Sequence, residues 1–414
     1  MKNVKSAECI MCKTQIKASP NITVCPECGG ILEIVYDYEW IGKNTSIEKI
    51  KKDPDRSMWR YREFLPVEET SAVSGLRAGG TPLYSAGRLG NLLGYSRLFI
   101  KDDGLNPTGS LKDRPSALAV VKAAEAGISS IACSSTGNAA SSLAGSAAAA
   151  GLSSYIFVPK RAPAAKVAQL LIFGAHVISV QGSYEDAFRL SSEAISRWGW
   201  YNRNAAINPY LSEGKKTVSF EIAEQLGFSA PDFVAASVGD GCTIAGIWKG
   251  FKDLFAAGFI NKLPRLISVQ ASGCRPINRA FEAGNEILEP ADENTIADSI
   301  AVGIPRNFHK AVRALRESNG ITANVSDEDM LHAMALAGKT TGVFGEPAGM
   351  ASIAGLMKLA GKGIIPKDSL IVSVVTGNGL KDIKSASKAV REPIKCNPDM
   401  ESLLAAFEAD EGMR

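Results

Sequence analysis

The sequence lacks several features that would assign it to whole classes of protein. It contains no run of about 18 apolar residues, so no membrane span is expected. Its first ten residues, MKNVKSAECI, contain no apolar stretch typical of a secretory signal, so we expect a cytoplasmic location. The net charge of +3 over 414 residues is small, and no nucleic-acid partner is expected.

Histidine is also scarce, with only three in the chain. The sequence shows no Ser/His/Asp order and no HxxxH motif, so it does not support a serine hydrolase or a metalloprotease. Chemistry that depends on some other side chain is therefore favoured.

The eight cysteines are unevenly spread, and four lie within the first 28 residues. Cys9 and Cys12 form one CxxC pair, and Cys25 and Cys28 form a second, followed by two glycines. Two such pairs can supply the four thiolates of a tetrahedral zinc site with no open position. This spacing predicts a structural zinc ribbon; the alternatives are redox-active dithiols or a knuckle without metal.

From about residue 95 onward, short apolar runs alternate with helical patterns. Strands are predicted at 97–101, 131–133, 154–158, 176–180, 233–238, 266–269 and 370–375, and helices at 111–126, 138–150, 164–173 and 184–198. Apolar strands separated by helices indicate parallel sheets covered on both faces, and this many strands need more than one sheet. The fold class is therefore α/β, with ligands expected beyond the carboxyl ends of the strands.

One lysine occupies such a position. Lys112, in the run NPTGSLKDR, lies between a predicted strand and a predicted helix. A lysine that forms a Schiff base must be partly desolvated to be nucleophilic near neutral pH, which suits an inward-facing junction. Taken alone, Lys112 is better interpreted as a solvated lysine at a helix start.

Three further loops make the functional reading stronger. Ser135, Thr136 and Asn138, in SSTGN, form a cup suited to a carboxylate. The loop Gly239, Asp240, Gly241, Cys242 and Thr243 is a candidate phosphate nest, or else an ordinary tight turn. Thr376 ends the last strong strand. Because helix N-termini lower thiol pKa values, Cys242 is also a candidate reactive thiol.

The order of these motifs, together with GEPAG and TGNGLKD, resembles that of fold-type II pyridoxal-phosphate enzymes. With the four-Cys segment and the motifs MWRYR, GTPL and EGKKT, nearly all of residues 1–390 resembles the threonine synthase family. The resemblance implies two open, twisted parallel-sheet domains of the tryptophan synthase β-like kind plus the small zinc ribbon. It also implies a homodimer.

The resemblance further implies a role for each motif. Lys112 is similar to the lysine that carries pyridoxal phosphate and moves protons on the substrate. Asn138 would bond the cofactor's 3′-oxygen, and Thr376 its pyridine nitrogen. Residues Gly239, Asp240, Gly241, Cys242 and Thr243 would hold the cofactor phosphate. Ser135, Thr136 and Asn138 would hold the substrate carboxylate.

The implied domain ranges are as follows: 1–40, the zinc ribbon; 41–95, a segment packing on the large domain; 96–230, mainly the small domain; 231–390, mainly the large domain; and 391–414, a C-terminal tail.

One departure bears on the substrate. Family members often carry Asn-Ser and then an Arg before EGxKT, and the Arg binds the substrate phosphate; here those positions are Ala205, Ala206 and Leu211. An unpaired phosphate needs fixed cations. The substitutes that the sequence offers are Lys101, Arg114, Arg203, Lys215 and Arg306.

Three hypotheses follow from the resemblance. The first is a lyase that converts O-phospho-L-homoserine and water to L-threonine and phosphate. The second is replacement or elimination on a related amino acid, either O-phosphoserine plus sulfite to cysteate, or dehydration of threonine or serine. The third is a catalytically idle protein that binds the cofactor. In the first two, the partner is a small amino acid or amino-acid phosphate.

Overall fold

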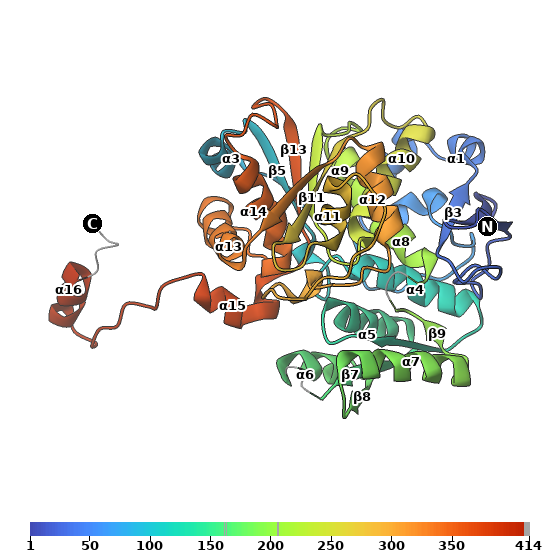
Figure 1. Ribbon diagram of the computed structural model, residues 1–414, viewed down its shortest axis with the longest axis horizontal. Coiled ribbons are helices and arrows are strands. Elements are labelled where there is room, and N and C mark those ends of the chain that lie inside the picture. The colour runs from blue at the N-terminus through green and yellow to red at the C-terminus, as the bar shows by residue number, and fades with distance from the viewer. Residues whose placement is uncertain (161, 163, 205–206, 410–414) are drawn as a thin grey trace.

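A computed structural model describes residues 1–409 apart from 161, 163, 205 and 206. In these residues the strands form three sheets, a large one, a smaller one and an N-terminal one (Figure 1). No helix in this part of the chain is both long enough and apolar enough to cross a membrane.

The large sheet has six strands in the order β12-β11-β10-β13-β5-β4. Their bounds are β4 Leu83–Ser85, β5 Arg97–Asp102, β10 Phe233–Ser237, β11 Arg265–Ala271, β12 Ile321–Val325 and β13 Leu370–Val375. All pairs are parallel except β4–β5, at one edge. Every residue of β10 and β13 is buried, as expected for central strands with helices on both faces.

Two apolar clusters cover the two faces of this sheet. Alternate residues of β10 point to opposite sides, so Val234 and Ala236 join one cluster while Phe233 and Ala235 join the other. The helices on the first side include α9 Thr217–Gln225, α10 Cys242–Ala256, α11 Pro276–Glu282 and α12 Phe308–Glu317. Those on the second side are α3 Gly87–Leu93, α13 Asp327–Thr341 and α14 Pro347–Leu359.

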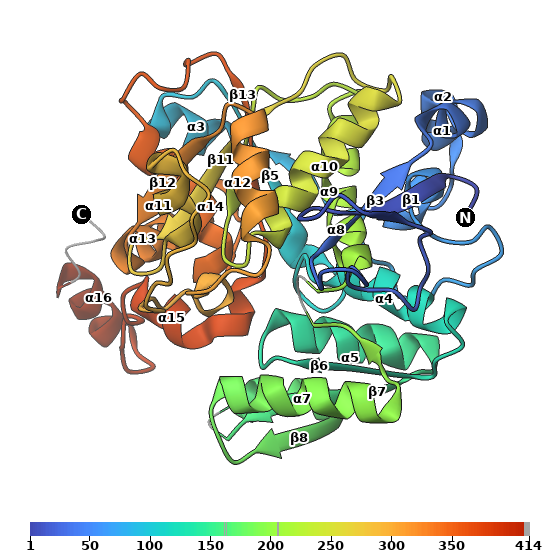
Figure 2. The ribbon, with the colours of Figure 1, turned by 45° about the vertical axis from the view of Figure 1, so that its right-hand side comes forward.

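The smaller sheet is wholly parallel, with the order β8-β7-β6-β9. Its strands are β6 Ser130–Ser134, β7 Ser153–Pro159, β8 His176–Val180 and β9 Tyr201–Asn202. Ile156 and Val158 of β7 pack with α5 Asn138–Ala150, whereas Phe157 packs with α7 Tyr184–Trp198. Thus α5 and α7 cover opposite faces (Figure 2).

The N-terminal sheet is antiparallel, in the order β2-β1-β3. Its strands are β1 Val4–Cys9, β2 Gln15–Ile16 and β3 Leu32–Tyr36. It packs on the large-sheet side of the molecule, where Tyr36 donates a hydrogen bond of 2.6 Å to Glu213 of α8 Pro209–Lys215. Lys310 of α12 donates to the carbonyl of Leu32 at 2.8 Å. These bonds fix the sheet against helices that border the site described below.

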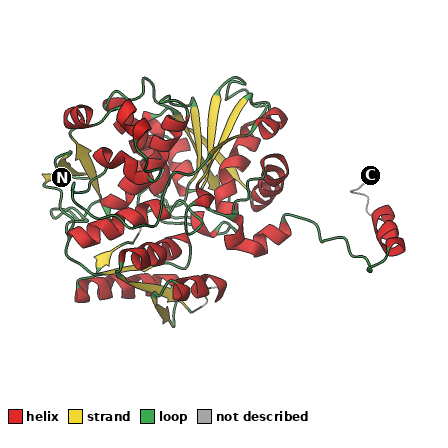
Figure 3. Ribbon diagram, turned by 180° about the vertical axis from the view of Figure 1, so that it is seen from behind, coloured by secondary structure: helices red, strands yellow, loops and turns green. Residues whose placement is uncertain are grey.

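The remaining helices connect these layers. They are α1 Tyr38–Asn44, α2 Ile47–Lys52, α4 Asp113–Glu125, α6 Ala164–Ile172, α15 Ile383–Lys388 and α16 Met400–Ala409, with short 3-10 helices η1 Met58–Phe64, η2 Asp103–Leu105, η3 Asp298–Ile300 and η4 Gly379–Asp382. Helix α16 has no buried residue and lies away from the body of the molecule (Figures 1 and 3).

The α/β class and the parallel sheets are confirmed, and four predicted bounds match the structure: 138–150, 176–180, 184–198 and 370–375. The sequence predicted no strand at the positions of β4, β9 and β12. Strand β5 lies in the large sheet although it falls in the predicted range 96–230, because β5 pairs with β13. The domain ranges themselves stay a prediction.

Candidate active site

The loop that carries Lys112 lies beside the carboxyl end of β13. The backbone N–H of Leu111 donates to the carbonyl of Thr376 at 2.9 Å, and the N–H of Asn378 donates to the carbonyl of Gly109 at 2.9 Å. Strands β5 and β13 are parallel neighbours, so the segments that follow them meet at one edge of the sheet. Lys112 and Thr376, predicted to share a site, are therefore close together.

Lys112 has the environment of a reactive amine. It is the N-cap of α4, and no described carboxylate lies within ion-pair distance of its ammonium. Burial lowers the pKa of Lys112 to about 8, and the positive charges of Lys215 and Arg203 add to this effect. A substantial neutral fraction near neutral pH makes this amine both a nucleophile and a base.

Asn138 begins α5 and reaches across to the large-sheet side. Its side-chain N–H donates to Glu346 Oε1 at 2.6 Å. Glu346 is the N-cap of α14, and burial raises the pKa of its carboxyl group. A Cβ at Gly377 would collide with this carboxylate. Glu346 was not among the predicted site residues, although the GEPAG motif that contains it was one of the signals.

The glycine loop leads from β10 into α10. Gly241 has φ +84°, and a Cβ there would lie 2.8 Å from that of Ala311; a Cβ at Gly239 would lie 2.8 Å from Ile300 Cα. No described side chain caps the first turn of α10. The N–H groups of Cys242 and Thr243 are therefore available to a phosphate, which a helix N-terminus favours.

Asp240 and Cys242 differ in what they contribute to this loop. Asp240 accepts hydrogen bonds from the backbone N–H of Arg306 at 2.6 Å and from the Cys242 thiol. Burial raises the pKa of the Asp240 carboxyl and of the Cys242 thiol. Burial therefore acts against the reactivity expected of Cys242, which stays a prediction.

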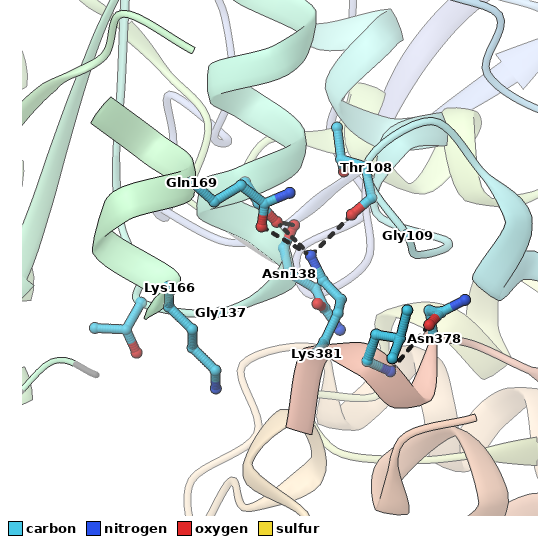
Figure 4. A pocket seen from close by; sticks show the side chains of 11 residues that line it. Thr108, Gly109, Gly137, Asn138, Lys166, Gln169, Asn378 and Lys381 are labelled. Carbon is cyan, nitrogen blue, oxygen red and sulfur yellow. Dashed lines mark hydrogen bonds between the residues drawn. The ribbon is translucent and has the colours of Figure 1, made fainter. Parts of the chain in front are cut away.

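A cavity of about 280 Å³ opens beside Asn138, and Gly109 and Asn378, from the two loops that meet near Lys112, also line it (Figure 4). Thr136 and Asn138 of the predicted carboxylate cup line it, whereas Ser135 does not. Lys381 projects into the same space, where its ammonium donates to the carbonyl of Thr108 at 2.8 Å and to Ser141 Oγ at 3.0 Å. Lys166 also lines the cavity. Hydroxyls, amides and ammonium groups suit an amino-acid carboxylate or another small anion.

Leu211 faces the interior of the protein. It is 1% exposed and belongs to the apolar cluster that covers the smaller sheet, together with Cys133 and Leu143. Ala205 and Ala206, at the two positions where many family members carry Asn-Ser, lie outside the described residues.

The four N-terminal cysteines come together as predicted. Their sulfur atoms all lie within 4.8 Å of one another, with Cys9–Cys28 at 3.5 Å and Cys12–Cys25 at 3.6 Å. Sulfurs bound tetrahedrally at about 2.3 Å from a zinc ion would be about 3.8 Å apart. The described cluster could therefore hold a metal ion.

Comparison with known proteins agrees with this geometry. A family model described as "Pyridoxal-phosphate dependent enzyme" matches residues 76–377. Threonine synthase of Methanocaldococcus jannaschii is 41% identical over 95% of this chain and 97% of its own. That of Methanosarcina acetivorans is 38% identical over 97% and 98%.

Solved structures share the fold. Maize serine racemase superimposes with a TM-score of 0.63 at 23% identity, over 79% of this chain and 91% of its own. Threonine deaminase isoform 2 of Solanum lycopersicum gives a TM-score of 0.64 at 20% identity, over 75% and 87%. At these identities the likeness shows the fold alone.

Proposed function

The chain belongs to the pyridoxal-phosphate dependent enzymes and, among them, to the threonine synthase family, and on that premise we propose that it converts O-phospho-L-homoserine and water to L-threonine and phosphate. The observation that carries the proposal is the placement of Lys112. Its amine is buried without an ion-pair partner among the described residues and has a pKa of about 8, and the groups that act on this pKa include Cys242, at the start of α10, and Glu346, which bonds Asn138 of the polar cavity.

The described residues fit pyridoxal phosphate. Lys112 would carry the cofactor, and the N–H groups at the start of α10 would hold its phosphate, where only glycine fits at 239 and 241. Asn138 and Thr376 would orient its ring. When bound, the cofactor supplies an electron sink that stabilises negative charge on the carbon next to the substrate's amino group.

The side chains of the site do the remaining work. Lys112, once free of the cofactor, is the base placed to move protons on the substrate, since its pKa is close to the working pH. Thr376 offers a neutral hydroxyl, which cannot keep a ring nitrogen protonated as a carboxylate would, so a moderate electron sink is expected. Thr136 and Asn138 are placed to bind the substrate carboxylate.

The four-Cys cluster is proposed to bind zinc in a structural role. All four positions of a tetrahedral ion would be taken by sulfur, and none would remain for a substrate. We also propose, from family membership alone, a cytoplasmic homodimer.

A substrate panel on purified holoenzyme tests the function. Equimolar phosphate and threonine from O-phosphohomoserine are the expected products. Cysteate formed from O-phosphoserine and sulfite, or 2-oxobutyrate formed from threonine, would replace the proposal with one of the other two lyase reactions. Bound cofactor with no turnover on any of these substrates would identify a catalytically idle protein.

A further inference from the structure

Leu211 occupies the position of the family's phosphate-binding arginine, so other cations would have to bind a substrate phosphate in this chain. The family's usual phosphate-binding arginine is absent, and Leu211 is packed in the apolar core, where it cannot contact a phosphate. A substrate that carries a doubly charged leaving group still needs fixed cations near Lys112.

Three of the five candidate cations are already engaged. Lys101 and Arg114 are fully buried and pair with Glu221 at 2.7 and 2.6 Å, and Arg114 also pairs with Asp103 at 2.7 Å. The guanidinium of Arg306 stacks on the ring of Phe188 at 4.1 Å from its centroid. Lys101 and Arg114 thus have anionic partners, and Arg306 is only partly buried, so none of the three is a fully buried cation without an anionic partner.

Arg203 differs from them. It follows β9, is 1% exposed, and its Nε and Nη2 both donate to Ser116 Oγ at 3.0 Å. No described carboxylate pairs with it. Ser116 lies one helical turn beyond Lys112, so Arg203 crosses the first turn of α4 just behind the reactive amine.

Lys215 is the second buried cation without an anionic partner among the described residues. It is 3% exposed, and no described residue gives its ammonium a hydrogen bond or an ion pair. It lies on α8, four residues beyond Leu211, and therefore on the same side of the helix. Its Cβ packs against α10 at Gly246, about one turn from the start of that helix.

Helix α8, which carries Lys215, packs against the start of α4, since a Cβ at Gly214 would lie 2.6 Å from the carbonyl oxygen of Arg114. The charges of Lys215 and Arg203 also act on the reactive amine. After burial, Lys215 and then Arg203 exert the largest effects on the pKa of Lys112, and Lys215 is also the strongest charge acting on Cys242. Arg203 also acts on Cys133, which shares an apolar cluster with Leu211.

Two buried cations without anionic partners are costly, so a ligand that supplies negative charge is expected there. We propose that Arg203 and Lys215 together form the subsite for the phosphate group of the substrate, in place of the missing arginine. The cofactor's own phosphate is served by the backbone at the start of α10, which leaves this pair for a second phosphate. This inference rests on the proposed function for its choice of substrate.

The direct probe is inorganic phosphate, titrated calorimetrically into the holoenzyme, in which the cofactor already fills its own phosphate site. Arg203→Met and Lys215→Met are each expected to weaken phosphate binding by about 30-fold and to raise the KM for O-phosphohomoserine by a similar factor. Cofactor affinity, followed by visible absorbance, should change less than about threefold.

Two further sets of variants sharpen the test. Lys262→Met removes an exposed lysine that pairs with Asp232. This pair lies at the amino ends of β10 and β13, away from the site, so the variant should change none of these values. Arg203→Gln and Lys215→Gln remove the same two charges and replace any methionine variant that fails to fold. Arg203→Lys keeps the charge without the planar fork and should weaken phosphate binding by less than Arg203→Met.

The outcomes separate this inference from the proposed function. Unchanged phosphate affinity in the Arg203 and Lys215 variants overturns the inference, even if the wild type makes threonine. Loss of the cofactor with normal phosphate binding by the remaining holoenzyme also overturns it, because the cations would then serve the cofactor. If the wild type binds phosphate through this pair but leaves O-phosphohomoserine intact, the subsite stands and the proposed substrate fails.

Discussion

The side-chain amide of Asn138 donates a hydrogen bond of 2.6 Å to the carboxylate of Glu346, across the space between α5 and α14. Asn138 projects from the helix that covers the smaller sheet, and its hydrogen bond to Glu346 on the large-sheet side fixes the orientation of its side chain. Because the Glu346 charge also acts to raise the pKa of Lys112, this carboxylate influences two of the residues that would hold the cofactor.

Two substitutions at Glu346 separate these effects. Glu346→Ala removes the acceptor and should lower kcat by about tenfold through misplacement of Asn138, whereas Glu346→Gln should recover most of that loss. Both variants remove a negative charge near Lys112, so the pKa of Lys112 should fall below its value of about 8 in the wild type. Steady-state kinetics and the pH dependence of cofactor binding measure the two effects; equal kcat values in Ala and Gln variants would exclude a positioning role.

Lys112→Ala should abolish both the visible absorbance of bound cofactor and the activity, because the reacting amine is lost. In the wild type, the rate of cofactor uptake by the apoenzyme should rise with pH, with a midpoint near 8, since the neutral amine is the reactive form. An ordinary lysine would give a midpoint near 10.4. Stopped-flow absorbance between pH 6 and 10 distinguishes the two.

The N-terminal cysteines should bind close to one equivalent of zinc. Chelation, or Cys12→Ser, should lower the melting temperature, because a metal bound only by the folded chain stabilises it. Tyr36 and Lys310 tie this sheet to α8 and α12, so activity should fall with the metal content. Cys396→Ser, at an exposed cysteine outside the cluster, is the control. A metal-free protein with unchanged stability would contradict the prediction.

Glu221 should be among the most stabilising charges in the protein. Although burial opposes its ionisation, Arg114 and Lys101 hold the pKa of Glu221 well below its usual range. Glu221→Gln leaves those cations with less compensation and should lower the free energy of unfolding by about 3–5 kcal/mol at pH 7. The exposed pair of Glu286 with Arg316 supplies the control Glu286→Gln, which should cost less than about 1 kcal/mol.

The pH dependence of that effect has a definite sign. A carboxylate whose pKa is depressed in the folded state contributes its full stability above its unfolded pKa, about 4.3, and loses it as pH falls through the folded value. The difference between wild type and Glu221→Gln in urea unfolding should therefore shrink below about pH 4. A difference independent of pH would show that the ion pairs are not its origin.

The local features of the fold could be predicted from the amino-acid sequence. Apolar runs ended by Gly or Pro gave the strands and helices of the parallel sheets, because burial on both faces requires such runs. The two CxxC pairs placed four thiols together through short turns. Lys112, Asn138 and the glycine loop were found because strand, loop and helix follow one another along the chain.

Contacts between residues far apart in the sequence became evident only from the packed fold. The missed strand β12 lies at the sheet edge and is half-buried, so its sequence shows no continuous apolar run. Glu346 acquires its role from the approach of Asn138, 208 residues away. Leu211 differs from Arg203 and Lys215 in what surrounds each side chain: an apolar cluster encloses the first, and the other two are buried without anionic partners. Burial and pairing depend on the packed fold, and the linear order of residues does not contain them.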